Sequence, residues 1–269
     1  MPGSVPFRLS LTGDAADYHQ FQAYDGYNAL AGFAWTLSLV TNYVETGVIR
    51  HRGDFPGRRA VRAKAISEGS LNADFIVWIT DNAQMLGLGA GLGAAPFLYS
   101  VVRRVIARNL GEDVADVDPE IAELNDKRGG DLEALVALTE PAIRQTHSVI
   151  GKGADDVTIV GGFNVLAELD HSTKAYVTEN FEDDEFKEAI VTVAAFNANS
   201  GYGSVFDPSL GRTVPISMSR ENLRRLRRVF SWGLDQYANR TGETIRIGFT
   251  RIMALDGTPK RYLIQAASR

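Results

Sequence analysis

The chain has 269 residues, of which 45% are hydrophobic and 23% charged, and its net charge is −5. This composition is typical of a globular protein with one large core or two small ones, and it excludes a positive field over the whole molecule that would attract nucleic acid. With no Cys and four His, disulfides and thiolate chemistry are excluded, and we predict no metal site and no cofactor. The first residues lack a basic segment followed by an apolar one, so we expect no signal peptide and a cytoplasmic protein.

The first part of the chain predicts an antiparallel sheet packed on a long helix. Residues 7–12 and 70–79 alternate between apolar and polar side chains, as half-buried strands do. Residues 24–46 have apolar side chains at helical spacing, with Asp25 as a candidate N-cap and Gly47 as the stop.

Helix 24–46 is apolar on more than one face, which indicates that it is covered on several sides. We therefore predict a core helix that also forms an oligomer interface. The interface residues we expect are Phe33, Trp35, Leu39 and Tyr43.

A basic segment follows this helix, with Asp54 as the nearby acid. Its cations are Arg50, Arg52, Arg58, Arg59, Arg62 and Lys64. On strands, alternate residues share a face, so Arg50 would align with Arg52 and Arg62 with Lys64. This pattern predicts a hairpin that binds an anion or a partner, and the alternative is a solvated hairpin paired with acids elsewhere.

Residues 82–102 carry no charge, and three interpretations compete for them. A membrane span is long enough at about 20 apolar residues, but alternate glycines and Pro96 disfavour a helix through the whole run. A phosphate-binding loop is a weak match, because residues 80–85 separate the candidate strand 75–79 from the glycines, and Asp113 lies in an acidic loop rather than at a strand end. We favour a packed glycine-rich segment at 82–96, followed by a helix that starts at Pro96, ends at 109 or 110 and stops at Gly111.

The middle of the chain predicts helices and a domain boundary. A short helix is expected at 120–125, and an amphipathic one at 131–149 with a kink at Pro141. We place the boundary at residues 151–154. It separates an α+β domain at 1–150 from a small barrel-like domain at 155–269.

The C-terminal half predicts a small β-barrel or half-barrel with one long helix, so the fold class as a whole is α+β. Strands are expected at 157–160, 163–169, 185–196, 203–207, 213–218, 243–254 and 260–267, and helices at 173–180 and 220–238. The turn after residue 196 is rich in residues that tolerate left-handed backbone and has the character of a ligand-binding turn. It contains Asn197, Asn199, Gly201 and Gly203.

Helix 220–238 carries the most concentrated basic patch of the chain. Ser219 is its expected cap, and residues such as Leu226 and Phe230 are expected to face inward. The outward row, with Arg225 beside it, consists of Arg220, Arg224, Arg227 and Arg228. These side chains could contact nucleic-acid phosphates, an anionic nucleotide or acids of a neighbouring subunit, or they could be solvated.

Several stretches resemble a family of uncharacterised bacterial proteins with two domains of unknown function. They are YDGYNALAGFAWTLSLVTNYVETGVI, SEGSLNADF, VTVAAFNANSGYGSVFDPSLGRTVPISM and TPKRYLIQA. The resemblance implies a helix-bearing N-terminal domain joined to a small C-terminal barrel, and it implies no catalytic residue.

The sequence contains no arrangement typical of a catalytic site, since Asp170, His171 and Ser172 are adjacent rather than on separate elements. We therefore predict a non-catalytic, self-associating binding or scaffold protein of a bacterial multi-protein system. One alternative is a membrane-acting effector that uses residues 82–102. Another is a nucleotide-binding or nucleic-acid-binding protein that uses the arginine patches.

Overall fold

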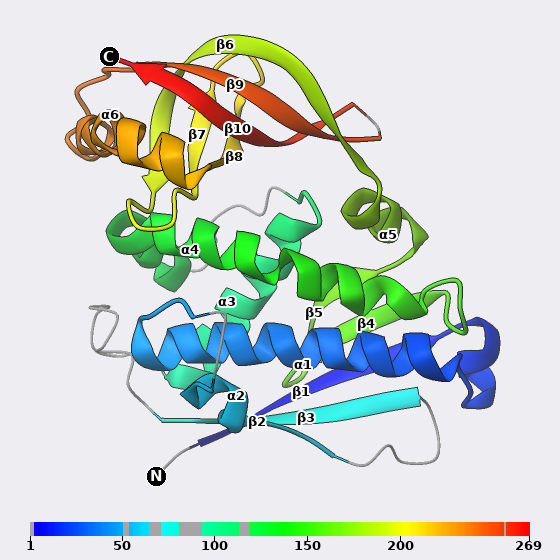
Figure 1. Ribbon diagram of the computed structural model, residues 1–269. Helices are drawn as coiled ribbons and strands as arrows, with labels where there is room; N and C mark the ends of the chain where they lie inside the picture. Colours follow the sequence, from blue (N-terminus) through cyan, green and yellow to red (C-terminus); the bar gives the residue numbers. More distant parts are fainter. Residues whose placement is uncertain (1–2, 51–53, 65–70, 81–92, 113–118, 256) are drawn as a thin grey trace. The chain divides into compact units, whose positions relative to one another are not determined.

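The computed structural model describes residues 3–50, 54–64, 71–80, 93–112, 119–255 and 257–269, and it divides the chain into two compact units. The first unit consists of Met1–Ile121 and Leu138–Thr178, and the second of Ala122–Ala137 and Glu179–Arg269. Each unit has its own sheet and helices (Figure 1). The predicted α+β class is confirmed.

The first unit is built on a five-stranded antiparallel sheet. Its strands are β1 (Gly3–Thr12), β2 (Val61–Ala63), β3 (Leu71–Ile79), β4 (Asp156–Gly161) and β5 (Asn164–Leu169). They lie in the order β2-β3-β1-β4-β5, and every neighbouring pair is antiparallel. In β1 and β3 alternate side chains are buried, so one face of the sheet is packed and the other is more open, as the alternating sequence predicted.

The helices of the first unit pack on one face of this sheet (Figure 1). They are α1 (Ala23–Thr46), α2 (Pro56–Ala60), α3 (Ala94–Asn109), the ends of α4 (Pro119–Thr146) and α5 (His171–Thr178), with short 3-10 turns at Asp14–Tyr18 and His147–Val149. The two predicted long helices of this region, 24–46 and the one beginning near Pro96, are confirmed. Gly47 ends α1 in the left-handed conformation, and Gly111 follows α3 with a positive φ of 79°.

The predicted N-cap of α1 is wrong. The helix begins one residue earlier than expected, with Gln22 at the cap position, and no side chain caps it. Asp25 lies in the first turn instead, where its carboxylate accepts a bond of 2.9 Å from Lys152 Nζ. An acid in the first turn is favourable because of the helix dipole.

The uncharged run is described only in its second part, because residues 82–92 lie outside the described residues. The rest belongs mainly to α3, whose Phe97, Leu98, Val101 and Val102 are fully buried. None of the helices in the described part of the chain combines the length and the apolarity needed to cross a bilayer.

The expected boundary at 151–154 differs from the division into compact units. Strands β4 and β5 follow that boundary, but β4 pairs with β1 along Phe7–Thr12, so both strands belong to the first sheet. The first unit therefore extends to Thr178. Helix α4 also differs, since the two expected helices form one element interrupted at Arg128, where φ is −146°, and Pro141 lies inside it.

The second unit contains a closed ring of five strands, which agrees with the predicted small barrel. The strands are β6 (Asn180–Phe196), β7 (Gly203–Asp207), β8 (Arg212–Met218), β9 (Ile245–Ala254) and β10 (Pro259–Ser268). Their order around the ring is β10-β8-β7-β6-β9. The long strand β6 pairs with β9 over Asn180–Val191 and with β7 over Thr192–Phe196, while β8 and β10 are parallel.

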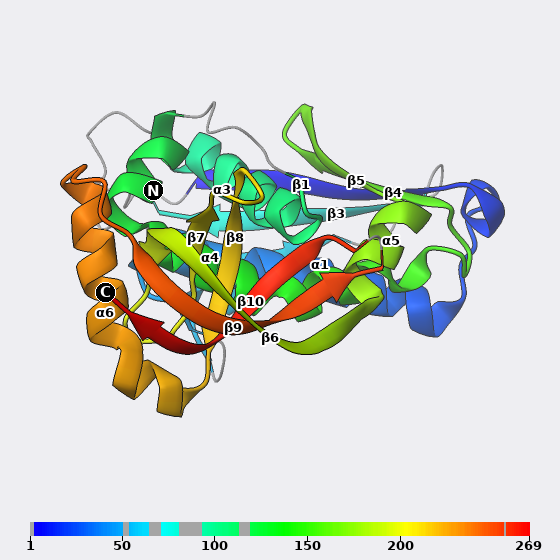
Figure 2. The same ribbon diagram turned by 90° about the horizontal axis from the view of Figure 1, so that it is seen from above.

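Helix α6 (Arg220–Ala238) connects β8 to β9 and lies beside the strands (Figure 2). Leu226 and Phe230 point into the apolar core of the ring, and Phe196 and Phe230 pack with ring centroids 5.2 Å apart. Gly233 allows the close approach, because a Cβ there would lie 2.7 Å from a methyl group of Val193. The core of the second unit is therefore shared by the ring and by one face of α6.

Candidate functional site

The sequence of α6 separates a core face from a basic face. Ser219 caps the helix by accepting a bond of 3.2 Å from the backbone N–H of Asn222, as predicted. Apolar residues recur at helical spacing and are held by the ring. The opposite side is exposed and basic, and its arginines are Arg220, Arg224, Arg225, Arg227 and Arg228. We call these five residues the arginine face.

Four members of the arginine face have no protein partner among the described residues. Within that part of the chain, the side chains of Arg220, Arg224, Arg227 and Arg228 make no hydrogen bond or ion pair. Arg225 differs, because its guanidinium donates to the carbonyl of Gln265 at 3.1 Å and to Asn222 Oδ1 at 3.2 Å. The free guanidinium groups present planar forks of donors that match phosphate or carboxylate oxygens.

An aromatic side chain adjoins the arginine face. Trp232 is partly buried and packs against the ring core, and the guanidinium of Arg269 lies over its ring at 4.9 Å from the centroid. Sequence reasoning did not assign Trp232 to the site. Its position four residues after Arg228 was the signal, because residues four apart are neighbours on a helix surface.

The predicted turn of the ring is held mainly by internal bonds. Asn197 Oδ1 accepts bonds from the backbone N–H groups of Asn199 (3.0 Å) and Ser200 (3.1 Å), and Asn197 Nδ2 donates to Asp131 at 2.9 Å. Gly201 has a φ of 78°, which favours glycine. A Cβ at Gly203 would lie 2.3 Å from the carbonyl oxygen of Ala195, so this residue allows strands β6 and β7 to approach. These contacts give the turn a structural role.

The basic segment of the first unit does not form the predicted hairpin. Residues 56–60 are the short helix α2, which Pro56 can begin because its missing N–H costs little there. Arg58 and Arg59 are exposed on this helix, and Arg59 lies 3.6 Å from Asp54. Strand β2 pairs with β3 at the sheet edge.

The remaining cations of that segment are dispersed. Arg62 is on β2 and Lys64 follows it, both exposed, and Arg50 is exposed before α2. Arg52 lies outside the described residues. Helix α2 lies between Arg50 and Arg62, where the predicted hairpin needed a turn between two strands.

The expected interface residues of α1 are mostly inside the first unit. Phe33, Leu39 and Tyr43 are at most 1% exposed, so they have no surface to offer a second copy. Trp35 is half-buried and packs on Phe55 with ring centroids 5.6 Å apart. The apolar breadth of α1 is explained by packing on several sides.

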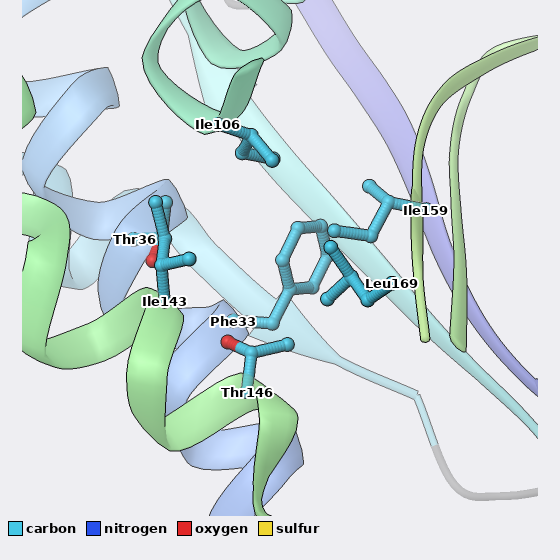
Figure 3. Close-up of a pocket in the computed structure, with 7 residues that line it drawn as sticks. All are labelled: Phe33, Thr36, Ile106, Ile143, Thr146, Ile159 and Leu169. Carbon is cyan, nitrogen blue, oxygen red and sulfur yellow. The ribbon is translucent and has the colours of Figure 1, made fainter. Parts of the chain in front are cut away.

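A small gap beside Phe33 in the first unit is lined by apolar groups and two hydroxyls (Figure 3). Its lining residues are Phe33, Thr36, Ile106, Ile143, Thr146, Ile159 and Leu169. It is too narrow for a water molecule and has no charged group in its lining. It is a packing defect between helices and sheet, and we assign no site to it.

Two buried polar groups that the sequence did not reveal stabilise the units. In the ring, the hydroxyl of Tyr262 donates to Asp207 at 2.7 Å, and Ser209 donates to the same carboxylate. Burial and the bond to Asp207 raise the pKa of Tyr262. Burial acts to raise the pKa of Asp207 as well, but the hydrogen bonds from Ser209 and Tyr262 outweigh it and the pKa is lowered.

In the first unit, His147 is fully buried, with Nδ1 2.7 Å from the carbonyl oxygen of Ile143 and Nε2 3.2 Å from Thr173 Oγ1. Burial lowers the pKa of His147, although the bond to Ile143 opposes this. A neutral imidazole suits this arrangement, because it donates from Nδ1 and accepts at Nε2. Since both ring nitrogens are engaged, His147 has a structural role.

Comparison with known proteins defines the family but not the activity. A family model described as a domain of unknown function, DUF7946, matches residues 7–178. The chain therefore belongs to the DUF7946 family, and the match ends at the last residue of the first unit. No curated protein and no solved structure matches the chain. The expected likeness to a family of unknown function is confirmed for the first unit.

Proposed function

We propose that the protein is a non-catalytic binding protein and that its second unit binds the phosphate backbone of a nucleic acid through the arginine face of α6. We retain from the sequence the prediction of a bacterial, cytoplasmic protein. The observation that carries the proposal is a set of exposed arginines whose side chains have no partner among the described residues: Arg220, Arg224, Arg227 and Arg228.

The concentration of charge on α6 explains how an acidic protein can bind a polyanion. The chain as a whole has a net charge of −5, but the arginine face carries five cations on one side of a single helix. Exposed charges more than about 10 Å away are largely screened at physiological salt, so the local cations dominate at this surface. Arginine also suits phosphate better than lysine does, because its planar fork can donate two bonds to one phosphate.

The connectivity of the ring gives independent support. The first strand of the ring, β6, pairs with the second, β7, and with the fourth, β9. The third strand, β8, pairs with β7 and with the fifth strand, β10, and β9 pairs with β10. Helix α6 lies between β8 and β9 in the chain. This arrangement resembles the oligonucleotide- and oligosaccharide-binding fold, a five-stranded Greek-key barrel. A fold hosts many functions, so the connectivity counts only together with the arginine face.

Ligands of that fold usually lie across its second and third strands, here β7 and β8. In this ring Arg212 is the one basic residue of these two strands, and its guanidinium is held by the carbonyl of Pro259 at 2.7 Å. Phe206 is the exposed aromatic there, at 39%. We therefore place the phosphate contacts on α6 instead.

The test is charge reversal on α6 against a matched reversal elsewhere. Binding of a labelled oligonucleotide is measured by fluorescence anisotropy for the wild type, for Arg224→Glu with Arg228→Glu, and for Arg62→Glu with Lys64→Glu. Both double variants change the net charge equally at exposed positions. We expect the α6 variant to lose affinity by about tenfold or more, and the control to lose much less.

Equal losses in the two variants would contradict the proposal, because they would trace the effect to net charge alone. A loss confined to the Arg62 and Lys64 variant would transfer the site to the first unit. Absence of binding by the wild type at low salt would also overturn the proposal. Self-association and membrane action remain predictions from the sequence, and neither is needed for this function.

A further inference from the structure

Trp232 lies in line with two members of the arginine face. It follows Arg228 by four residues and Arg225 by seven, so the three side chains lie along one strip of the helix surface. Arg228 is exposed, and Trp232 is partly buried at the border between the arginine face and the ring core. An aromatic ring is therefore placed directly beside cations.

The position of Trp232 is fixed from several directions. It packs against the core cluster of the ring, and the guanidinium of Arg269 covers its ring at 4.9 Å from the centroid. Arg225, about two turns earlier on the same strip, is held by its bond of 3.1 Å to the carbonyl of Gln265 on β10. A side chain that is already ordered loses little conformational entropy when a ligand packs on it.

A flat aromatic surface among arginines matches the chemistry of single-stranded nucleic acid. An unpaired base can stack on an indole while its phosphates contact guanidinium groups, whereas the bases of a duplex are already stacked on one another. In the absence of a ligand, the planar guanidinium of Arg269 already lies over the indole ring of Trp232. This face of the ring can therefore pack against another planar group.

We propose that Trp232 is a stacking platform for one base of a single strand, so that the second unit prefers single-stranded nucleic acid to duplex. This inference rests on the proposed phosphate-binding function of α6. The base takes the place of the Arg269 guanidinium over the indole ring, and the released arginine contacts a phosphate. The site is therefore made of Trp232, Arg225, Arg228 and Arg269.

The first experiment compares Trp232→Leu and Trp232→Phe on two probes, an oligo-dT strand and a duplex, with an oligo-U strand to compare RNA with DNA. The leucine variant is expected to lose about tenfold in affinity for both single strands, the effect of one lost stacking contact, and to bind the duplex as the wild type does. The phenylalanine variant keeps an aromatic face and is expected to lose less. Equal affinity of the wild type for strand and duplex would overturn the inference.

The second experiment leaves Trp232 in place, because its replacement could disturb the core of the ring. Trp35→Phe with Trp78→Phe leaves Trp232 as the single tryptophan of the chain. Saturating oligo-dT is expected to quench its emission, and a duplex at saturation is not. Unchanged emission with bound oligo-dT would refute stacking on Trp232 while leaving the arginine contacts intact. Failure of the α6 charge reversal to weaken binding would instead refute the proposed function itself.

Discussion

Helices α1 and α6 are both long, but their surroundings differ. In α1 the residues from Thr36 to Val44 are all buried, including the polar side chains of Thr41 and Asn42. In α6 three residues, Leu226, Phe230 and Gly233, are buried, and the other side is solvated and basic. The apolar faces of α1 are covered by other elements of its own unit, so they need no partner. Helix α6 has one apolar face in the core, and its other face remains exposed and available to a partner.

Because of this difference, we expect the binding surface on the second unit and not on α1 of the first. The breadth of apolar surface on α1 suggested an interface, yet that surface is used for packing. Arg220, Arg224, Arg227 and Arg228 contribute little to folding, because exposed charges without partners among the described residues add almost no stability. Their concentration on one face is therefore better explained by a ligand than by the stability of the ring.

The largest effect that we expect comes from truncating the α1 core. Phe33→Ala removes a ring that packs edge-on against Phe7 and Phe75, at centroid distances of 6.3 and 5.3 Å, and should cost about 3–5 kcal/mol in the free energy of unfolding. Denaturant titration of the purified protein measures this. Tyr24→Ala, at a position 81% exposed on the same helix, is the control and should cost less than about 0.5 kcal/mol. A mild Phe33→Ala variant that changed the oligomeric state would restore the interface hypothesis.

A smaller loss of stability is expected when the buried hydrogen bond between Tyr262 and Asp207 is removed. Tyr262→Phe leaves the Asp207 carboxylate with one donor fewer and should cost about 1–3 kcal/mol. Because the folded-state pKa of Asp207 is lowered, its stabilisation is present at neutral pH and is lost as pH falls through that pKa. In the variant this pKa rises, so the acid loss begins at higher pH.

Thermal unfolding at a series of pH values checks both expectations for Tyr262→Phe. Tyr237→Phe is the matched control, since this tyrosine is 51% exposed on α6. An acid-unfolding curve that is the same for the wild type and Tyr262→Phe would mean that the Tyr262 bond does not stabilise the Asp207 carboxylate.

The smallest effect on stability is expected from His147. Its folded-state pKa is lowered by burial, so the unfolded chain takes up a proton at a pH where the folded chain does not. Stability therefore falls as pH drops below about 6.5, by at most about 1.4 kcal/mol for each pH unit, until the folded-state pKa is reached. His147→Gln should flatten this part of the profile, while His19→Asn, at an exposed position, should leave it unchanged. A profile that is equally steep without His147 would exclude this cause.

The sequence predicted elements better than it predicted their partners. Ser219, the apolar spacing through Leu226 and Phe230, and the glycine after α1 act locally, so the limits of α6 and α1 could be found from a few neighbouring residues. The pairing of β4 with β1 joins residues more than a hundred positions apart. Alternation reveals that a strand exists but not which strand it pairs with, and for that reason the expected boundary fell before β4.

The sequence was sufficient to predict the positive charge of the candidate site, but not which other side chains lie around it. The row of arginines follows from helical spacing. Whether acidic residues of other elements pair with these arginines depends on the tertiary structure. The same limitation applies to α1. Its apolar residues are in the core because other elements cover them, and the sequence of the helix does not show those elements. Trp232 was left out of the predicted site because Phe230, two residues earlier, belongs to the core, although the helix turns by about 200° over two residues.

The most direct test is the salt dependence of oligo-dT binding by the wild type and by the Arg224→Glu, Arg228→Glu variant. For single strands each phosphate contact contributes about 0.7 to the slope of log K against log salt concentration. We predict a slope that is shallower in the variant by about 1.4, as expected for two lost contacts. Identical slopes for the two proteins would contradict phosphate binding by the arginine face.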